Sequence, residues 1–369
     1  MDYLEKIRLH WLSNYDWRVQ EAHLNQYPHY KTEIEGMRVH FVRVRPQSTR
    51  YTQVYPILIS HGWGGSFYEF YKIMPLLTNP ADADFAFEVI CPSIPGFAFS
   101  DPAHKPGLSP VAIGRLFHKL MTRLGHQRYF LQGGDWGSLI TTTMATLYPE
   151  NVQGLHLNFL PMAPIAYPGL NVKYQLGRYV HPRFAVSAED EHKVYPVDAI
   201  EAATYEENGY FHIQSTKPDT VGTALNSDPI GLAAYLLEKA VWATNPEDAD
   251  LPDGGLEKHW SLDELLTEVM LYWLTGNVAA TQRIYKESAR DKLQPAVFVS
   301  QVYVPMAAAQ FPHEITKTPR NFLEYKYTNL VRYTDMPRGG HFAAWEEPQL
   351  MAEDIIAFVE GVTAERSEL

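Results

Sequence analysis

The sequence has a single cysteine, Cys91, among its 369 residues. One cysteine excludes an intramolecular disulfide framework and any zinc site built from several thiolates. Cys91 lies in the apolar run FEVICPSIPGF. In such a run we expect a buried structural thiol rather than a reactive one.

Excess positive charge is also missing. The chain has 31 Lys and Arg residues against 43 Asp and Glu residues, which gives a formal net charge of −12. A nucleic-acid partner requires clustered Lys and Arg that displace the counterions of the phosphate backbone. The sequence has no such cluster, so the composition excludes nucleic acid as the partner.

Long hydrophobic runs are absent as well. A membrane-spanning helix needs roughly 18 consecutive apolar residues, and no segment approaches that length. The first segment, MDYLEKIRLHWLSNY, has charges spread through it, unlike a signal peptide or an anchor. We therefore expect a cytoplasmic protein without a membrane anchor.

Short apolar runs alternate with helical patterns in the first part of the chain. YPILISHGW, FEVICPSIPGF and RYFLQGGD are strand-like, and helical spacing separates them. This rhythm is typical of a mostly parallel sheet with helices on both faces. The pattern then becomes mostly helical, and strand-like runs return only in VFVSQVYVPMAAAQF and NLVRYTDMP. A helical block inserted between strands is expected to cap the carboxyl edge of the sheet, where such sheets bind ligands.

Four segments follow from these patterns. We predict an N-terminal extension of two helices and a strand meander at 1–50, and the first part of an α/β core at 51–160. A helical cap domain is predicted at 161–292, and the second part of the core at 293–369.

The segment LQGGDWGSLI, residues 131–140, has the outline of a nucleophile elbow, a strained turn between a strand and a helix. Asp135 takes the raised position where serine is common, and no Gly-x-Ser-x-Gly motif occurs in the chain. Aspartate is also a favoured helix N-cap, so capping alone is the alternative interpretation. A carboxylate that attacks a saturated carbon leaves an ester, which water can hydrolyse, whereas serine would leave a stable ether. An aspartate with an ordinary pKa near 3.9 needs no base to ionise it.

Candidate partners for Asp135 occur in the chain order nucleophile, acid, base. His341, in RGGHFAAWEEP, follows the last strand-like run and a glycine pair, where a loop can bring an imidazole to the sheet edge. Glu314, in QFPHEITKTP, follows the preceding strand-like run. Asp335 is the alternative acid, but it lies within or beside the last strand. We expect it to face solvent or to pair with Arg332 or Arg338.

These motifs resemble the microsomal-type epoxide hydrolases, the group that includes the juvenile hormone epoxide hydrolases. The resemblance spans nearly the whole chain, through YPHYKTEIEGMRVHF, HGWGGSFYEFYKIMPLL, FEVICPSIPGF, GGDWGS, GYFHIQSTKPDTVG, GGLEKHWSLDELL and MPRGGHFAAWEEP. It implies the α/β-hydrolase fold and a hydrolase that adds water to an epoxide, giving a vicinal diol. It further implies no cofactor, no metal ion, a small apolar epoxide and water as the partners, and an assembly compatible with a homodimer.

The resemblance also implies roles for individual residues. It assigns the nucleophile to Asp135, the general base to His341 and the supporting acid to Glu314. It places two cap tyrosines on Tyr210 and Tyr285, whose phenols would donate hydrogen bonds to the opening epoxide oxygen.

Two backbone amides are the expected donors to the oxyanion of the ester hydrolysis step. One is the amide of Trp136, directly after the nucleophile, and the other is that of Trp63 in HGWGG. The family has proline where this chain has Gly64, which puts the rigidity of the oxyanion loop in doubt, because proline restricts φ and glycine does not. A milder difference is Ala98, at a position where glycine is common.

Two other functions remain open from the sequence. A haloalkane dehalogenase also uses an elbow aspartate and an ester, but it needs tryptophan or asparagine donors for the halide rather than a tyrosine pair. A catalytically inactive, ligand-binding member of the fold is the other alternative.

Overall fold

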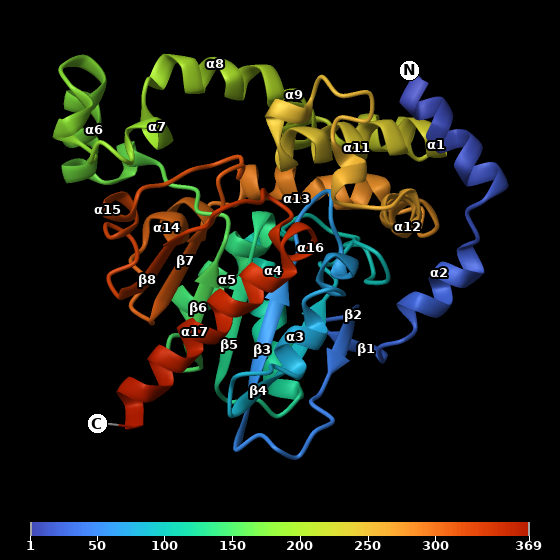
Figure 1. Ribbon diagram of the computed structural model, residues 1–369, viewed down its shortest axis with the longest axis horizontal. Coiled ribbons are helices and arrows are strands. Elements are labelled where there is room, and N and C mark those ends of the chain that lie inside the picture. The colour runs from blue at the N-terminus through green and yellow to red at the C-terminus, as the bar shows by residue number, and fades with distance from the viewer. Residues whose placement is uncertain (1, 368–369) are drawn as a thin grey trace.

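Eight strands form one sheet at the centre of the protein (Figure 1). They are β1 (His29–Ile34), β2 (Met37–Val44), β3 (Gln53–Ser60), β4 (Phe85–Pro92), β5 (Tyr129–Gly133), β6 (Val152–Leu157), β7 (Met306–Gln310) and β8 (Leu330–Asp335). The computed structural model describes residues 2–367. The strand order is β1-β2-β4-β3-β5-β6-β7-β8. Strand β2 is antiparallel to β1 and β4, and all other neighbours are parallel.

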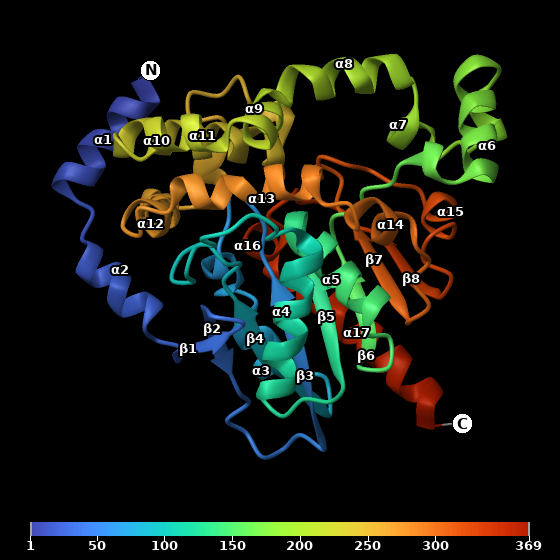
Figure 2. The same cartoon turned by 180° about the vertical axis from the view of Figure 1, so that it is seen from behind.

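Helices cover both faces of this sheet (Figures 1 and 2). Helices α4 (Pro110–Arg123), α5 (Asp135–Leu147) and α14 (Gln294–Val299) lie on one face. Helices α3 (Met74–Thr78) and α17 (Pro348–Ser367) lie on the other. Strands β4, β5 and β7 are buried at every residue. This burial explains why their sequences are nearly continuous apolar runs rather than alternating ones.

A helical cap connects β6 to β7 and lies over one end of the sheet (Figure 1). Its helices are α6 (Pro168–Tyr179), α7 (Glu191–Val194), α8 (Val197–Glu207), α9 (Gly209–Thr216), α10 (Pro218–Leu225), α11 (Pro229–Thr244), α12 (Leu262–Trp273) and α13 (Val278–Arg290). Helix α13 packs against α9 and α10. Helix α12 begins with a capping box in which Ser261 and Glu264 satisfy each other's backbone amides.

Short helices complete the chain. They are η1 (Phe67–Phe70), η2 (Pro164–Ala166), η3 (Pro182–Phe184), η4 (Pro246–Asp248), η5 (Leu256–Lys258), α15 (Arg320–Leu323) and α16 (Ala343–Glu346). No helix within residues 2–367 is both long and apolar enough to cross a membrane.

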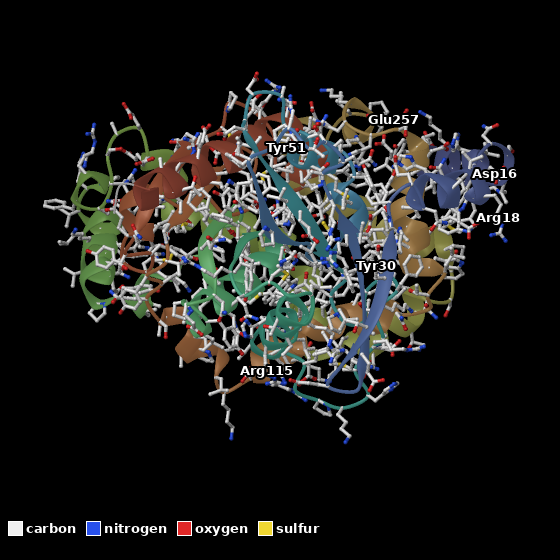
Figure 3. All side chains as sticks on the ribbon, turned by 90° about the horizontal axis from the view of Figure 1, so that it is seen from below. Asp16, Arg18, Tyr30, Tyr51, Arg115 and Glu257 are labelled. Atoms are coloured by element: carbon white, nitrogen blue, oxygen red, sulfur yellow. The ribbon has the colours of Figure 1, made fainter. Side chains whose placement is uncertain are left out.

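The N-terminal extension links the sheet to the cap. Helices α1 (Asp2–Ser13) and α2 (Trp17–Leu24) precede β1 and β2, which complete the sheet edge. Helix α1 packs against α11 and α12. Lys6 Nζ lies 2.6 Å from Glu257 Oε1, an ion pair at the periphery, where Figure 3 labels Glu257. The extension therefore contacts both the sheet and the cap. The division into segments 1–50, 51–160, 161–292 and 293–369 stays a prediction from the sequence.

One predicted strand is partly wrong. The run VFVSQVYVPMAAAQF forms a strand only at Met306–Gln310, and its first residues belong to α14. Pro295 stands in the first turn of α14, a position that favours a helix start. The helix packs against α5, so tertiary contact outweighs the strand preference of its valines.

Candidate active site

Asp135 stands at a sharp turn between β5 and α5, as the elbow motif predicts. Its φ is +45°, in the left-handed region that non-glycine residues rarely adopt. Glycines make the turn fit. A Cβ on Gly137 would lie 1.9 Å from the Ser60 carbonyl oxygen, and one on Gly133 would lie 2.4 Å from the Gly137 carbonyl oxygen. The strain at Asp135 is thus maintained by close packing of α5 onto the strands.

The carboxylate of Asp135 is held from one side. The Trp63 amide donates a 2.7 Å hydrogen bond to Oδ1. A Cβ on Gly62 would lie 2.1 Å from the same oxygen, so the loop needs glycine there to admit the carboxylate. In residues 2–367 the Trp136 amide makes no hydrogen bond to this carboxylate. One of the two predicted backbone donors is therefore engaged with Asp135.

The loop that carries Trp63 is fixed by a cap residue. Gly64 has a φ of +88°, which proline cannot adopt. Its amide donates a 3.0 Å hydrogen bond to the Tyr272 hydroxyl, which itself donates to the Gly65 carbonyl at 2.9 Å. A proline would have no amide hydrogen for this contact. Tyr272 of α12 thus restrains the loop at the position where the family pattern has proline.

His341 lies between two carboxylates. Its Nδ1 is 2.6 Å from Glu314 Oε1, and its Nε2 is 3.5 Å from Asp135 Oδ2. The alternative acid, Asp335, ends β8 and pairs with Lys193 at 2.6 Å. The Asp335 side chain is exposed to solvent, as one of the two expectations from the sequence has it. Arg332 and Arg338 are not its partners, because they pair with other carboxylates.

Pairing of two loops places the acid beside the base. Strands β7 and β8 are parallel neighbours, and the loops after them meet in a bridge between His313 and Gly340. This bridge brings together Glu314 and His341, each the next residue in its loop. Glu346 accepts hydrogen bonds from the amides of Gly340 and Phe342, both at 2.9 Å. The loop around the base is therefore held on both sides.

The two carboxylates control the charge of His341. Burial alone would lower the pKa of the imidazole, but the charges and hydrogen bonds of Glu314 and Asp135 outweigh it. Together they hold the pKa of His341 well above its usual value. The two carboxylates therefore favour the protonated form of the imidazole.

The two cap tyrosines face this centre from different helices. Tyr210 lies on α9 and Tyr285 on α13, with 6.0 Å between their ring centroids. Both rings contact the Trp63 ring, Tyr210 stacked at 5.4 Å and Tyr285 edge-on at 6.1 Å. Tyr285 also packs against Trp136 at 4.7 Å. Burial raises the pKa of both phenols above the usual value, so they remain protonated donors.

Sequence reasoning missed three polar residues near the centre: Glu69, Asn158 and Tyr272. Glu69 and Asn158 line a small cavity together with Asp135 and His341. Glu69 had a signal, because it is the single acid in the aromatic segment SFYEFY. Asn158 and Tyr272 had none, since each depends on the meeting of distant segments.

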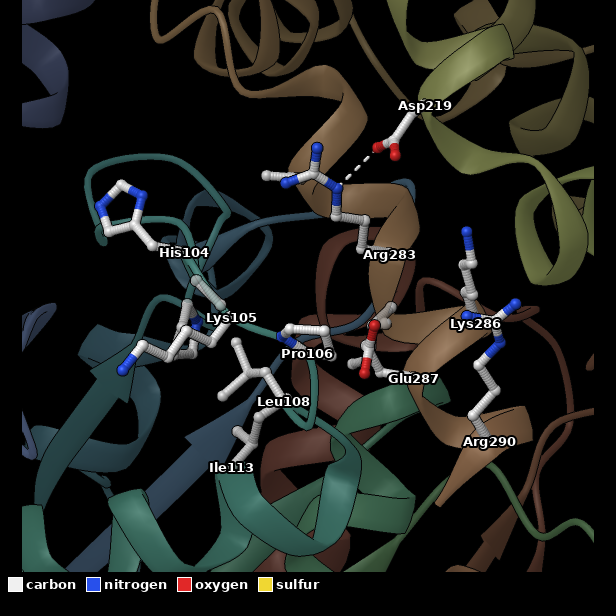
Figure 4. A pocket seen from close by; sticks show the side chains of 14 residues that line it. His104, Lys105, Pro106, Leu108, Ile113, Asp219, Arg283, Lys286, Glu287 and Arg290 are labelled. Atoms are coloured by element: carbon white, nitrogen blue, oxygen red, sulfur yellow. Dashed lines mark hydrogen bonds and ion pairs between the residues drawn. The ribbon is translucent and has the colours of Figure 1, made fainter.

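A separate cleft of about 320 Å³ lies between residues 103–108 and α13 (Figure 4). Its lining combines apolar and charged side chains, and Arg283 pairs there with Asp219 at 2.6 Å. Tyr285 and Asp135 do not line it. Within residues 2–367 no group of three or more His, Cys, Asp or Glu side chains is arranged to hold a metal ion.

Known proteins resemble this chain along nearly its whole length. The family description "Epoxide hydrolase N terminus" matches residues 1–70, and "alpha/beta hydrolase fold" matches residues 55–179. Epoxide hydrolase 1 of Sus scrofa is 49% identical over 97% of this chain and 80% of its own length. Juvenile hormone epoxide hydrolase 2 of Ctenocephalides felis is 46% identical over 96% of this chain and 76% of its own.

A solved structure agrees with these relatives. The crystal structure of juvenile hormone epoxide hydrolase from the silkworm Bombyx mori superposes with a TM-score of 0.93 at 38% identity. The match covers 98% of this chain and 85% of that one. Fold, sequence and the geometry around Asp135 thus agree, and the chain belongs to the epoxide hydrolases of the α/β-hydrolase fold.

Proposed function

We propose that this epoxide hydrolase opens its substrate by attack of Asp135 Oδ2 on an epoxide carbon. The observation that carries this proposal is that the two oxygens of the Asp135 carboxylate have different neighbours. The Trp63 amide binds Oδ1, whereas Oδ2 faces His341 at 3.5 Å and is free to attack. The new carbon–oxygen bond gives an ester on Asp135, and the epoxide carbon–oxygen bond breaks.

Tyr210 and Tyr285 donate hydrogen bonds to the epoxide oxygen as that bond breaks. Negative charge develops on this oxygen, and preorganised donors in a buried site stabilise such charge strongly. Both phenols stay protonated because burial raises their pKa. Their common contact with the Trp63 ring supports this role, because it places them on the side of Asp135.

Water then hydrolyses the ester. His341 first gives its proton to the alkoxide left by ring opening and becomes neutral. It then takes one proton from the water, whose oxygen bonds to the ester carbon, while Glu314 stabilises the imidazolium. The amides of Trp63 and Trp136 stabilise the oxyanion. On collapse, the diol oxygen leaves with the proton from His341. The new Asp135 carboxyl then passes its proton to His341, which restores the carboxylate and imidazolium of the starting state.

Aromatic residues around the centre support a small apolar epoxide as the substrate. The Phe159 ring meets the His341 ring edge-on at 5.6 Å, and Phe342 does so at 5.2 Å. Together with Trp63 and Trp136 they give the centre apolar walls. A cytoplasmic location, a homodimeric state and independence of cofactors remain predictions from the sequence.

A single turnover in oxygen-18 water tests the ester. The first diol should carry an unlabelled oxygen from Asp135, and the label should appear in the peptide that contains residue 135. Asp135→Asn should abolish both turnover and adduct, whereas the matched variant Asp335→Asn should retain them. Diol labelled in the very first turnover would show that water attacks the epoxide directly.

One observation bears on the alternative activity, haloalkane dehalogenation. The indole N–H groups of Trp63 and Trp136 are buried, and that of Trp63 has no hydrogen-bond partner within residues 2–367. Such donors suit a departing halide. A bromoalkane matched in length to a good epoxide substrate tests this activity through bromide release, and the tyrosine pair leads us to expect none. Binding of an epoxide without adduct or diol would instead indicate a ligand-binding protein.

A further inference from the structure

Glu69 is an enclosed carboxyl group that the steps above do not use. It lies in η1, close to the loop that carries Trp63. In residues 2–367 its side chain makes no hydrogen bond and no ion pair. Gly65 makes room for it, because a Cβ there would lie 2.1 Å from Glu69 Oε2. The carboxyl is surrounded by protein yet partly accessible to water-sized molecules, because it faces a cavity.

This cavity has a volume of about 10 Å³. Glu69, Asn158, Asp135 and His341 are among its lining residues. A space of roughly 10–15 Å³ holds one water molecule, which needs between two and four polar partners. The cavity thus has the size and the polar groups for a single water beside the base and the nucleophile.

The other polar side chains of the cavity already make hydrogen bonds within the protein. His341 has Nδ1 bound to Glu314, so only Nε2 is left for the water. Asn158 accepts a 2.8 Å hydrogen bond from Gln132 and donates a 3.4 Å one to the His341 carbonyl. A base that removes one proton does not by itself orient the water oxygen. The Glu69 carboxyl makes no side-chain hydrogen bond within residues 2–367, so it offers an acceptor for the second O–H.

The charge state of Glu69 suits such a contact. Burial raises the pKa of this carboxyl well above its usual value, and the charges of Glu268 and Asp135 act in the same direction, while the charge of His341 acts against them. A protonated carboxyl has one donor and one acceptor and carries no charge. It therefore does not repel Asp135 and does not compete with Glu314 for the imidazolium.

We propose that Glu69 is a further catalytic residue, which holds the hydrolytic water for attack on the Asp135 ester. This inference rests on the proposed function. The water donates one O–H to Glu69 and loses its other proton to His341 Nε2, while its oxygen bonds to the ester carbon. Glu69 keeps its own proton throughout, so it changes neither the proton balance nor the charge of the reaction. Ring opening, which needs no water, does not depend on Glu69.

Separate measurement of the two half-reactions tests this role. In Glu69→Leu, which cannot hydrogen-bond, ester hydrolysis should slow about 10- to 100-fold, the usual result of losing one such contact. Formation of the ester and kcat/KM should stay close to wild type, while kcat falls and the ester accumulates in quenched samples. Glu69→Gln keeps a donor and an acceptor and should restore most of the rate. Glu69→Ala serves if the leucine variant does not fold.

The matched control is Glu268→Gln. Glu268 is a buried carboxyl that accepts a 2.8 Å hydrogen bond from Ser66 and does not line the cavity. Glu268→Gln should leave the rates of ester formation and ester hydrolysis in the same ratio as in the wild type. Wild-type hydrolysis in the leucine or alanine variant, or equal slowing of both half-reactions, would overturn the role of Glu69. Failure of the wild type to form any ester would instead overturn the proposed function.

Discussion

His341 and Asp135 face each other across 3.5 Å, between Nε2 and Oδ2, close enough for their charges to interact directly. The ionised Asp135 helps to raise the pKa of His341 in the free enzyme. In the mechanism that we propose, conversion of Asp135 into an ester removes that charge. The first proposed half-reaction would therefore lower the pKa of His341, the proposed base of the second.

This coupling predicts the pH dependence of ester hydrolysis. The rate constant should rise with pH and level off above the pKa that His341 has in the ester, because only the neutral imidazole accepts a proton. That pKa should be lower than the one measured for His341 in the free enzyme. Stopped-flow hydrolysis of the ester and NMR titration of the free enzyme give the two values. Equal values would contradict the coupling.

The tyrosine pair predicts a selective loss of ring opening. Tyr210→Phe or Tyr285→Phe should slow ester formation by about 10²-fold, the usual result of losing one oxyanion donor, and the double variant should nearly stop it. Tyr235 offers a matched control, since its ring also contacts Trp63 but its hydroxyl bonds to Gln214. Rapid-quench mass spectrometry measures the adduct. An unchanged rate in the double variant would rule out the phenols as donors.

The conformation of Gly64 predicts that restoring the family proline is harmful. Gly64→Pro should lower both stability and kcat, because proline cannot reach a φ of +88° and cannot donate to Tyr272. Gly64→Ala should cost about 1–2 kcal/mol for the left-handed backbone. It should also disturb Phe342, whose ring lies 3.3 Å from the new Cβ.

Gly36→Ala is the control for the backbone cost alone. Gly36 has a φ of +80° with no atom within 4 Å of a Cβ. In chemical denaturation, Gly36→Ala should lower the free energy of unfolding about as much as Gly64→Ala does. Its turnover rate should stay at the wild-type value. Wild-type stability and turnover in Gly64→Pro would show that the loop does not require this conformation.

Buried acids predict a stability that falls as pH rises. Burial raises the pKa of Glu268 from 4.5 to about 8. Between these values the folded state holds a proton that the unfolded chain has released, so the free energy of unfolding decreases with pH. Glu268→Gln should flatten this decrease and stabilise the protein near pH 8 by the order of a few kcal/mol. Urea unfolding across this pH range measures the slope.

Glu206 of α8 provides an exposed carboxyl for comparison. Glu206→Gln should leave the slope as it is in the wild type. A Glu268→Gln protein with the wild-type slope would show that Glu268 ionises normally in the folded state.

The parts of the site that local motifs encode could be predicted from the sequence. Asp135 is marked by its glycines, and Glu314 and His341 by their places after successive strands. The roles of Asn158, Tyr272 and Glu69 depend on contacts between segments that are far apart in the sequence. Local sequence patterns do not predict such contacts. The same reason explains the misassigned strand, because Val297 and its neighbours are helical through packing on α5.

The cap leaves the sheet after Leu157 and the chain returns at Met306, in the next strand. Strands β6 and β7 are parallel neighbours, with Leu155 opposite Met306, so the chain leaves β6 at the carboxyl edge and returns through α14 to the amino end of β7. An insertion anchored in this way can change in length and shape while the strands beneath keep their register. Asp135 and His341 follow strands β5 and β8 of the core, whereas Tyr210 and Tyr285 belong to the insertion. Exchange of this region between relatives should therefore alter which epoxides are accepted, provided that each new region brings its own pair of tyrosines.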